Sequence, residues 1–162
     1  MNRFLIDHHP DAIAKQLCDQ HIVKMPLEEA QMLCTALWHH DPSYAAIKGL
    51  YKPVHQKHPC TLWAMETQAN YQFAFKLYDA MLREYTYRYG KEHKSFWQVI
   101  NKLPDPINIE RVGFTTFGLA MPEILKNYDD PIQSYRDYYH LDKATFASWS
   151  HRPTPPWWDE SL

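Results

Sequence analysis

The fold is decided by residues 61–89, which read TLWAMETQANYQFAFKLYDAMLREYTYRY. This stretch contains no proline or glycine, and it is followed at once by Gly90, a residue type that commonly ends helices. Its apolar side chains recur at steps of three and four residues, the spacing of a helix face. They are Leu62, Met65, Ala69, Phe73, Leu77, Ala80, Met81 and Tyr85. The pattern predicts one long central helix over about residues 60–89.

Prolines mark the beginnings of the flanking helices, because the missing N–H of proline has no partner in a first helical turn. Pro10 opens one expected helix. Pro26 is expected to separate it from a second helix over residues 27–38, with a sharp kink or turn at residues 25–26. Further helices are expected at 43–48, 93–103, 131–139 and 142–149.

The remaining stretches contain several prolines and little periodicity. Residues 104–118 are expected to be irregular, and the tail PTPPWW at 153–158 is expected to lie extended against the body, since two adjacent tryptophans are costly to expose. The sequence therefore predicts an all-α protein, a single compact helical domain over residues 1–162 with proline-started flanking helices and an extended C-terminal tail.

The charges of the chain are unevenly distributed. Lys and Arg number 17 and Asp and Glu number 19, for a net charge of −2. Residues 51–102 carry a net charge of +4, whereas residues 1–50 carry −2 and residues 103–162 carry −4. This distribution excludes a protein that coats nucleic acid through bulk positive charge, but it permits a localised anion site in the middle third.

Two further features bear on the environment of the chain. No window reaches the roughly 18 apolar residues that are needed to span a bilayer, so no membrane partner is expected. The three cysteines, Cys18, Cys34 and Cys60, cannot all pair with one another, and a reducing cytoplasm is the expected location.

The densest polar cluster of the first half is CDQHIVKM at residues 18–25. On a helix, His21 and Lys24 share a face, where they could hold a phosphate or transfer a proton. The alternative is a solvated helix face with an incidental histidine, because polar pairs at this spacing are common.

A second cluster directly precedes the long helix and contains four groups able to hold an anion. They are Lys52, His55, Lys57 and His58. Helix N-termini present free N–H groups, so phosphate is a natural ligand there. One alternative is a basic surface loop in which Pro59 starts the helix. The other is a metal site built from His55, His58 and Cys60 with Cys18 and His21, but the spacing matches no standard zinc module, so no metal ligand is assigned.

A third cluster, REYTYRYGKEHKS at residues 83–95, interleaves cations with aromatic rings. Such a pattern suits nucleic acid, where cations meet phosphates and rings stack on unpaired bases. The candidates are Arg88, Lys91, His93 and Lys94 for phosphates, and Tyr85 and Tyr87 for bases. Packing of the tyrosines at the helix end explains the pattern equally well. Arg136, in an aromatic-rich segment, is a further candidate because it needs an anionic or carbonyl partner.

Five segments together resemble a family of small helical proteins common in bacteriophages. They are CDQHIVKM at 18–25, YKP and HPCTLW within 51–63, EYTYRYGK and HKS within 84–95, LAMP at 119–122 and SYRDYY at 134–139. The resemblance implies an amino acid:DNA transferase or an α-glutamyl/putrescinyl-thymine pyrophosphorylase of thymine hypermodification. Such enzymes displace pyrophosphate from a pyrophosphorylated 5-hydroxymethyluracil in DNA with an amine. Gln20 departs from the lysine of the pattern.

The resemblance implies roles for the candidate residues and partners for the chain. The partners would be DNA and a small amine or amino acid, in the cytoplasm of a host cell. The second cluster would neutralise the departing pyrophosphate, and His21 or Asp19, next to Lys24, would serve as the base. Trp63, Tyr85 and Tyr87 would stack on a flipped base. No cofactor is identified, and whether a divalent cation assists pyrophosphate departure is left open.

Two other functions compete with this interpretation. A DNA-base glycosylase would also flip a base, but it needs a lysine amine or an aspartate near the sugar. A non-catalytic module would instead bind nucleic acid or a host protein through the surface of residues 51–95.

Overall fold

The computed structural model describes residues 1–105 and 107–158, and every regular element in these ranges is helical. The all-α prediction is therefore confirmed. The α-helices are α1 Pro10–Gln16, α2 Asp19–His40, α3 Pro42–Ile47, α4 Pro59–Glu66, α5 Gln68–Tyr89, α6 Lys94–Val99 and α7 Pro131–Tyr138. Within the described ranges, none of these helices is both long and apolar enough to cross a membrane.

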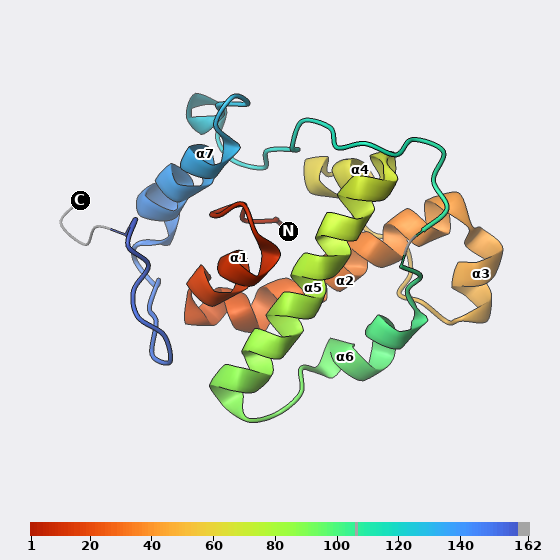
Figure 1. Cartoon of the computed structure of the whole chain (residues 1–162), viewed down its shortest axis with the longest axis horizontal. Helices are drawn as coiled ribbons and strands as arrows, with labels where there is room; N and C mark the ends of the chain where they lie inside the picture. Colours follow the sequence, from red (N-terminus) through yellow and green to blue (C-terminus); the bar gives the residue numbers. More distant parts are fainter. Residues whose placement is uncertain (106, 159–162) are drawn as a thin grey trace.

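The long central helix is present as α5, which crosses the middle of the molecule with α2 behind it (Figure 1). One side of α5 buries Phe73, Leu77 and Met81 against the N-terminal segment, α1 and the first half of α2. The other side buries Tyr78 and Leu82 against the second half of α2, α3 and α6. Apolar side chains on both sides of a helix indicate that the helix is buried.

The predicted helix over 60–89 is divided at Thr67, which leaves α4 as a separate element. Thr67 is extended, and its hydroxyl accepts a hydrogen bond from Asn70 N at 3.1 Å, so it caps α5. The next two N–H groups of α5 donate to the carbonyls of Arg111 and Val112. These two carbonyls, more than 40 residues away in sequence, thus accept the hydrogen bonds that an unbroken helix would have formed within itself.

The predicted boundary at Pro26 is wrong, because α2 runs from Asp19 to His40 with Pro26 inside it. The chain turns eight residues earlier, at Leu17 and Cys18. A proline inside a helix costs one hydrogen bond and roughly 3 kcal/mol. The two halves of α2 face the two hydrophobic clusters beside α5, and this burial offsets the cost.

The short helices near 43–48, 93–103 and 131–139 are observed as α3, as α6 with a following 3₁₀ turn, and as α7. The helix expected over 142–149 is wrong. A π-helical turn, Tyr139–Lys143, ends α7, and the chain then runs irregularly. Long-range hydrogen bonds hold it there, since Asp19 N donates to Ser148 O and Trp149 Nε1 donates to Gln16 O, both at 2.8 Å.

The C-terminal tail lies against the body as expected. Trp157 and Trp158 pack against the cluster that contains Tyr139, and the Trp158 ring stacks on His140 with centroids 4.7 Å apart. Residues 106 and 159–162 lie outside the described part of the chain.

Candidate active site

The N-terminal segment is tied to α2 by a buried ion pair. Arg3 Nε lies 3.1 and 3.0 Å from the two carboxylate oxygens of Glu29, and Arg3 Nη1 donates to Cys60 O at 2.9 Å. The side chains of Arg3 and Glu29 are almost completely enclosed. A bidentate contact of this kind sets both distance and orientation, so residues 1–4 are held in one position along α2.

This anchor places the backbone of the first residues against the neighbouring carboxylate, Glu28. Asn2 N donates to Glu28 Oε2 at 3.0 Å, and the amine of Met1 lies 3.6 Å from the same oxygen. Lys24, one turn earlier on α2, lies 3.5 Å from Glu28 Oε1. The Glu28 side chain is 11 % exposed. We call Met1, Asn2, Lys24 and Glu28 the amine–carboxylate site.

Groups from other parts of the chain hold Asn2 and Met1 in place. Its amide donates to Ala120 O at 2.8 Å, and its side-chain oxygen accepts from the Tyr135 hydroxyl at 3.0 Å. The Thr61 hydroxyl lies 3.9 Å from the sulfur of Met1. The site is therefore assembled from the N-terminus, α2, α4, α7 and the segment around residue 120.

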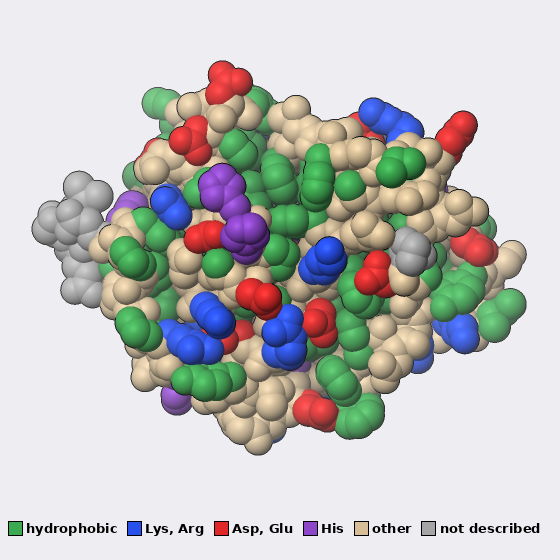
Figure 2. Space-filling model, in the orientation of Figure 1, with side chains coloured by type: hydrophobic (Ala, Val, Ile, Leu, Met, Phe, Trp, Pro, Cys, Tyr) green, Lys and Arg blue, Asp and Glu red, His purple; other side chains and the backbone are tan. Residues whose placement is uncertain are grey.

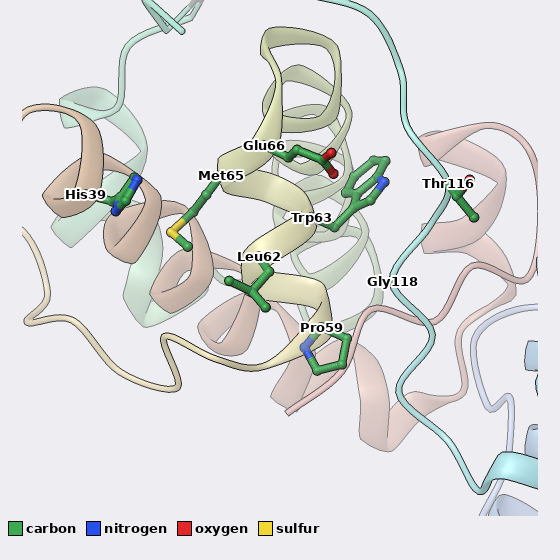
Figure 3. A pocket seen from close by; sticks show the side chains of 8 residues that line it. All are labelled: His39, Pro59, Leu62, Trp63, Met65, Glu66, Thr116 and Gly118. Atoms are coloured by element: carbon green, nitrogen blue, oxygen red, sulfur yellow. The ribbon is translucent and has the colours of Figure 1, made fainter. Parts of the chain in front are cut away.

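A cavity of about 510 Å³ lies over α4. Figure 3 shows Met65 on the side of α4 that faces His39, and Trp63 on the side that faces Thr116 and Gly118. Gly118 passes so close to α4 that a Cβ there would lie 2.4 Å from Pro59 O. The cavity is mainly apolar with Glu66 at its rim, which suits a flat organic ring.

The side chain of His21, which the sequence predicted as the base, is buried. Its ring stacks on Phe4 with centroids 4.3 Å apart, and Nδ1 is hydrogen-bonded to the Tyr139 hydroxyl. Burial, together with the charges of Lys143 and Lys24, lowers the pKa of His21 to about 3. The ring is therefore neutral at physiological pH and faces aromatic groups.

We expect the NMR ring signals of the buried His21 to stay constant between pH 5 and pH 8. The unfolded chain binds a proton at this histidine near pH 6.5, whereas the folded chain binds it only near pH 3. His21 therefore contributes stability above pH 6.5 that is lost progressively as the pH falls towards 3. A His21 signal that titrates near pH 6.5 in the folded protein would contradict this assignment.

Asp19 and Arg88 lie together in a buried network rather than on an open surface. The Arg88 side chain is 0 % exposed. It donates to Glu84 Oε1 at 2.7 Å, to Asp19 Oδ1 at 3.1 Å and to two carbonyls at the end of α1. Asp19 Oδ2 also accepts from Ser150 N at 2.7 Å. With its donors engaged inside the protein, Arg88 cannot reach a phosphate without leaving this network.

The cluster before α4 is partly engaged within the protein. Lys52 lies over the Trp38 ring, 5.0 Å from its centroid, and His58 caps α4 by accepting from Cys60 N at 3.2 Å. Burial and the charges of the chain amine and His55 lower the pKa of His58. His55 and Lys57 are exposed. The anion-holding groups are therefore dispersed along the loop, with Lys57 exposed to solvent.

Buried packing also accounts for several candidates of the third cluster. His93 accepts from Ser95 N and donates to Val23 O, so it joins α6 to α2. Both faces of the buried Trp63 ring are covered, by Phe117 at 4.3 Å and by the Arg3 guanidinium at 5.2 Å. Tyr85 packs between Tyr89 and His93.

Other members of that cluster stay on the surface. Lys91, Lys94 and Tyr87 are exposed, although the Arg152 guanidinium covers the Tyr87 ring at 3.9 Å. Arg136 donates to Ile6 O at 3.0 Å and lies over the Trp157 ring, so its partner is a carbonyl.

The face formed by α1 and α5 carries both signs of charge, as Figure 2 shows. Arg83 on this face pairs with Asp11 at 2.9 Å and with Asp79 at 3.0 Å. Among residues 1–105 and 107–158, no three His, Cys, Asp or Glu side chains converge as a metal-binding group.

The sequence interpretation gave no catalytic role to Asn2, Arg3, Glu28 or Glu29. Two signals pointed to them. Arg3 directly precedes the apolar run Phe4–Ile6, and the adjacent pair Glu28–Glu29 lies between the apolar residues Leu27 and Ala30. Charged side chains are buried only when they are paired.

The fold and the site define an all-helical protein in which the N-terminal backbone meets a buried carboxylate. The chain belongs to the family described as pyrimidine dimer DNA glycosylase, whose model matches residues 1–98. This match confirms a family that modifies or repairs DNA, and it corrects the resemblance to amino acid:DNA transferases, which is not the family found. No curated protein and no solved structure matches the chain.

Proposed function

We propose that the protein is a DNA glycosylase that detaches a damaged pyrimidine from its deoxyribose at the amine–carboxylate site. The observation that carries the proposal is the contact between Glu28 and the N-terminal amine at 3.6 Å. An amine beside a carboxylate supplies both a nucleophile and a group that accepts its proton. The description of the family supports the same reaction class.

The reaction requires one substitution at C1′ of the sugar. The neutral amine attacks C1′, the C1′–N1 bond breaks, and its electron pair leaves with the pyrimidine, which then takes up a proton. The proton lost by the amine passes to Glu28. The C1′–O4′ bond then opens as the nitrogen forms a C=N bond to C1′, and O4′ takes up a proton. The sugar is thereby linked covalently to the protein.

Two amines lie close enough to Glu28 to be the nucleophile, the amine of Met1 and Lys24. Peptide α-amines are weaker bases than lysine side chains, so a larger fraction is neutral at pH 7. Met1 is also held by the buried Arg3–Glu29 pair, whereas Lys24 is largely exposed. We therefore assign the attack to the amine of Met1.

Base flipping has a receiving cavity next to this site. The C1′ atom of a stacked nucleotide is difficult to reach inside a duplex, so such enzymes move a nucleotide out of the stack. The apolar cavity over α4 is large enough for one base, and the Cys60 thiol connects its lining to the site, because it lies 3.7 Å from Gly118 O and 3.7 Å from Asn2 Oδ1. We assign it to the extrahelical base.

The test uses a duplex with one thymine dimer, followed by sodium borohydride and by nucleoside mass spectrometry. Detachment of the base from its sugar and a reduced protein–DNA adduct support the glycosylase, and peptide mapping of the adduct distinguishes Met1 from Lys24. A second duplex carries pyrophosphorylated 5-hydroxymethyluracil and is incubated with putrescine or glutamate. An amine adduct on that base, with no detachment from the dimer, would favour the transferase instead.

Lys57→Ala is expected to weaken DNA binding and to reduce the salt dependence of log K by about one phosphate contact, a slope change near 0.9. Lys57 is exposed in the loop before α4 and has no ion pair among the described residues. Fluorescence anisotropy with a labelled duplex at several salt concentrations measures the slope. Lys126→Ala, which removes the partner of Glu123, is the control. An unchanged slope for Lys57→Ala would remove it from the interface.

A further inference from the structure

Two apolar side chains lie exposed on α2 beside the amine–carboxylate site. Val23 is 48 % exposed and Leu27 is 41 % exposed, and they are the exposed large apolar residues of α2 within the described chain. They are four residues apart, so they lie on one face of the helix, one turn from each other. Leu27 directly precedes Glu28, and Lys24 lies between the two.

The backbone that carries these side chains is rigidly held. Val23 O accepts a hydrogen bond from His93 Nε2 at 3.1 Å, and the Pro26 ring before Leu27 is buried. The residues after Leu27 are held by the contacts of Glu28 and Glu29 with the N-terminal segment. Leu27 and Val23 therefore project from a fixed support, and their exposed surface contributes little to the core.

We propose that Leu27, supported by Val23, inserts into the base stack of duplex DNA next to the nucleotide whose sugar meets Glu28. This proposal rests on the proposed function and names the residue that opens the substrate. Apolar side chains that enter a base step unstack it, at a cost of a few kcal/mol, and bend the duplex. A nucleotide beside an opened step leaves the stack more readily.

The charge next to the apolar pair favours DNA as the occupant. The Lys24 side chain is 64 % exposed between Val23 and Leu27. An apolar wedge with a cation beside it matches a duplex, which presents stacked bases flanked by phosphates. The wedge is also continuous with the proposed reaction centre, because Lys24 contacts the Glu28 carboxylate at 3.5 Å.

The experiment compares Leu27→Ala on two substrates with the same lesion. One duplex is fully paired. The other places the lesion opposite an abasic site, where the base stack is already open. We expect a rate about 10- to 100-fold below wild type on the paired duplex and within about threefold on the open one. Ile124→Ala, at a residue 91 % exposed, is the matched control and should keep the wild-type rate on both.

A second readout does not depend on catalysis. With 2-aminopurine next to the lesion, binding of the wild-type protein should raise the fluorescence, and binding of Leu27→Ala should not. The proposal would be overturned if Leu27→Ala lost the same fraction of the rate on both substrates. It would also be overturned if the variant kept the wild-type rate on the paired duplex or the wild-type fluorescence response. A change in oligomeric state of Leu27→Ala in light scattering would also overturn it, since the pair would then join copies of the chain. If the wild type processes neither substrate, the proposed function fails, and the fluorescence response still decides the insertion.

Discussion

Glu28→Gln should lower the rate of base release by about 10²- to 10⁴-fold while leaving DNA affinity nearly unchanged. The amide has nearly the same size as the carboxylate and still accepts the hydrogen bond from Asn2 N. It cannot take up the proton of the attacking amine, and it supplies no negative charge beside the positive charge that develops at C1′. Single-turnover kinetics on a duplex with one thymine dimer measure the rate.

The borohydride adduct should disappear in parallel with the rate, because both depend on the same covalent step. Glu123→Gln is the matched control, since this carboxylate is exposed and, among the described residues, pairs with Lys126 alone. Glu29→Gln is not a suitable control, because it disturbs the Arg3 pair that positions the site. A Glu28→Gln variant that keeps the full single-turnover rate would remove this carboxylate from the reaction.

Arg88→Met should lower the free energy of unfolding by about 3–5 kcal/mol, because it leaves Asp19 without its cation and the buried Glu84 with Arg152 alone. Arg88 joins α5 to α2 and to the end of α1 through four donated hydrogen bonds, to Glu84, to Asp19 and to the carbonyls of Ala14 and Lys15. Methionine fills part of the same volume, so the loss reports mainly the charge and the hydrogen bonds. Urea unfolding at pH 7 measures it.

Arg83→Met is the matched control, since its ion pairs with Asp11 and Asp79 are exposed and worth about 0–1 kcal/mol. The salt dependence of DNA binding should be the same in folded Arg88→Met as in wild type. A stable Arg88→Met variant with a reduced salt slope would instead place Arg88 at the DNA.

The hydrogen-bond network around Arg88 makes the free energy of unfolding depend on pH in the acid range. Burial alone would raise the pKa of Glu84, but hydrogen bonds from Arg152 and Arg88 hold this pKa below its ordinary value of 4.5. Asp19 is half-buried, and hydrogen bonds from Ser150 and Arg88 likewise lower its pKa. A carboxyl group whose pKa is lower in the folded protein than in the unfolded chain adds to the free energy of unfolding at pH values above its unfolded pKa. This contribution is lost as the pH falls through the folded pKa.

Local patterns predicted most of the helices. The apolar spacing of residues 61–89 and the stop at Gly90 identified α5, whose C-cap is left-handed at φ 66°. Proline starts identified α3 and α7, because the first turn of a helix depends on adjacent residues alone. The same rule failed at Pro26, where packing of both halves of α2 outweighs one missing hydrogen bond.

The polar clusters were less informative about the site. Asp19, His21 and Lys24 are close together in the sequence CDQHIVKM, but their side chains lie in three different surroundings. Asp19 meets Arg88, His21 meets Tyr139, and Lys24 meets Glu28. Neighbours along a helix share a face, but what covers that face comes from other elements.

By itself, the sequence determined the all-α class, the central helix and the positive charge of the middle third, because these depend on local spacing and composition. Only the tertiary structure decided which charges are buried and which meet solvent. It joined residues 1–3 to Glu28 and Glu29 across about 26 positions, and it enclosed Arg88 and His21. The physical reason is that a buried charge requires a partner, and that partner is supplied by whichever segment the packing of the helices brings near.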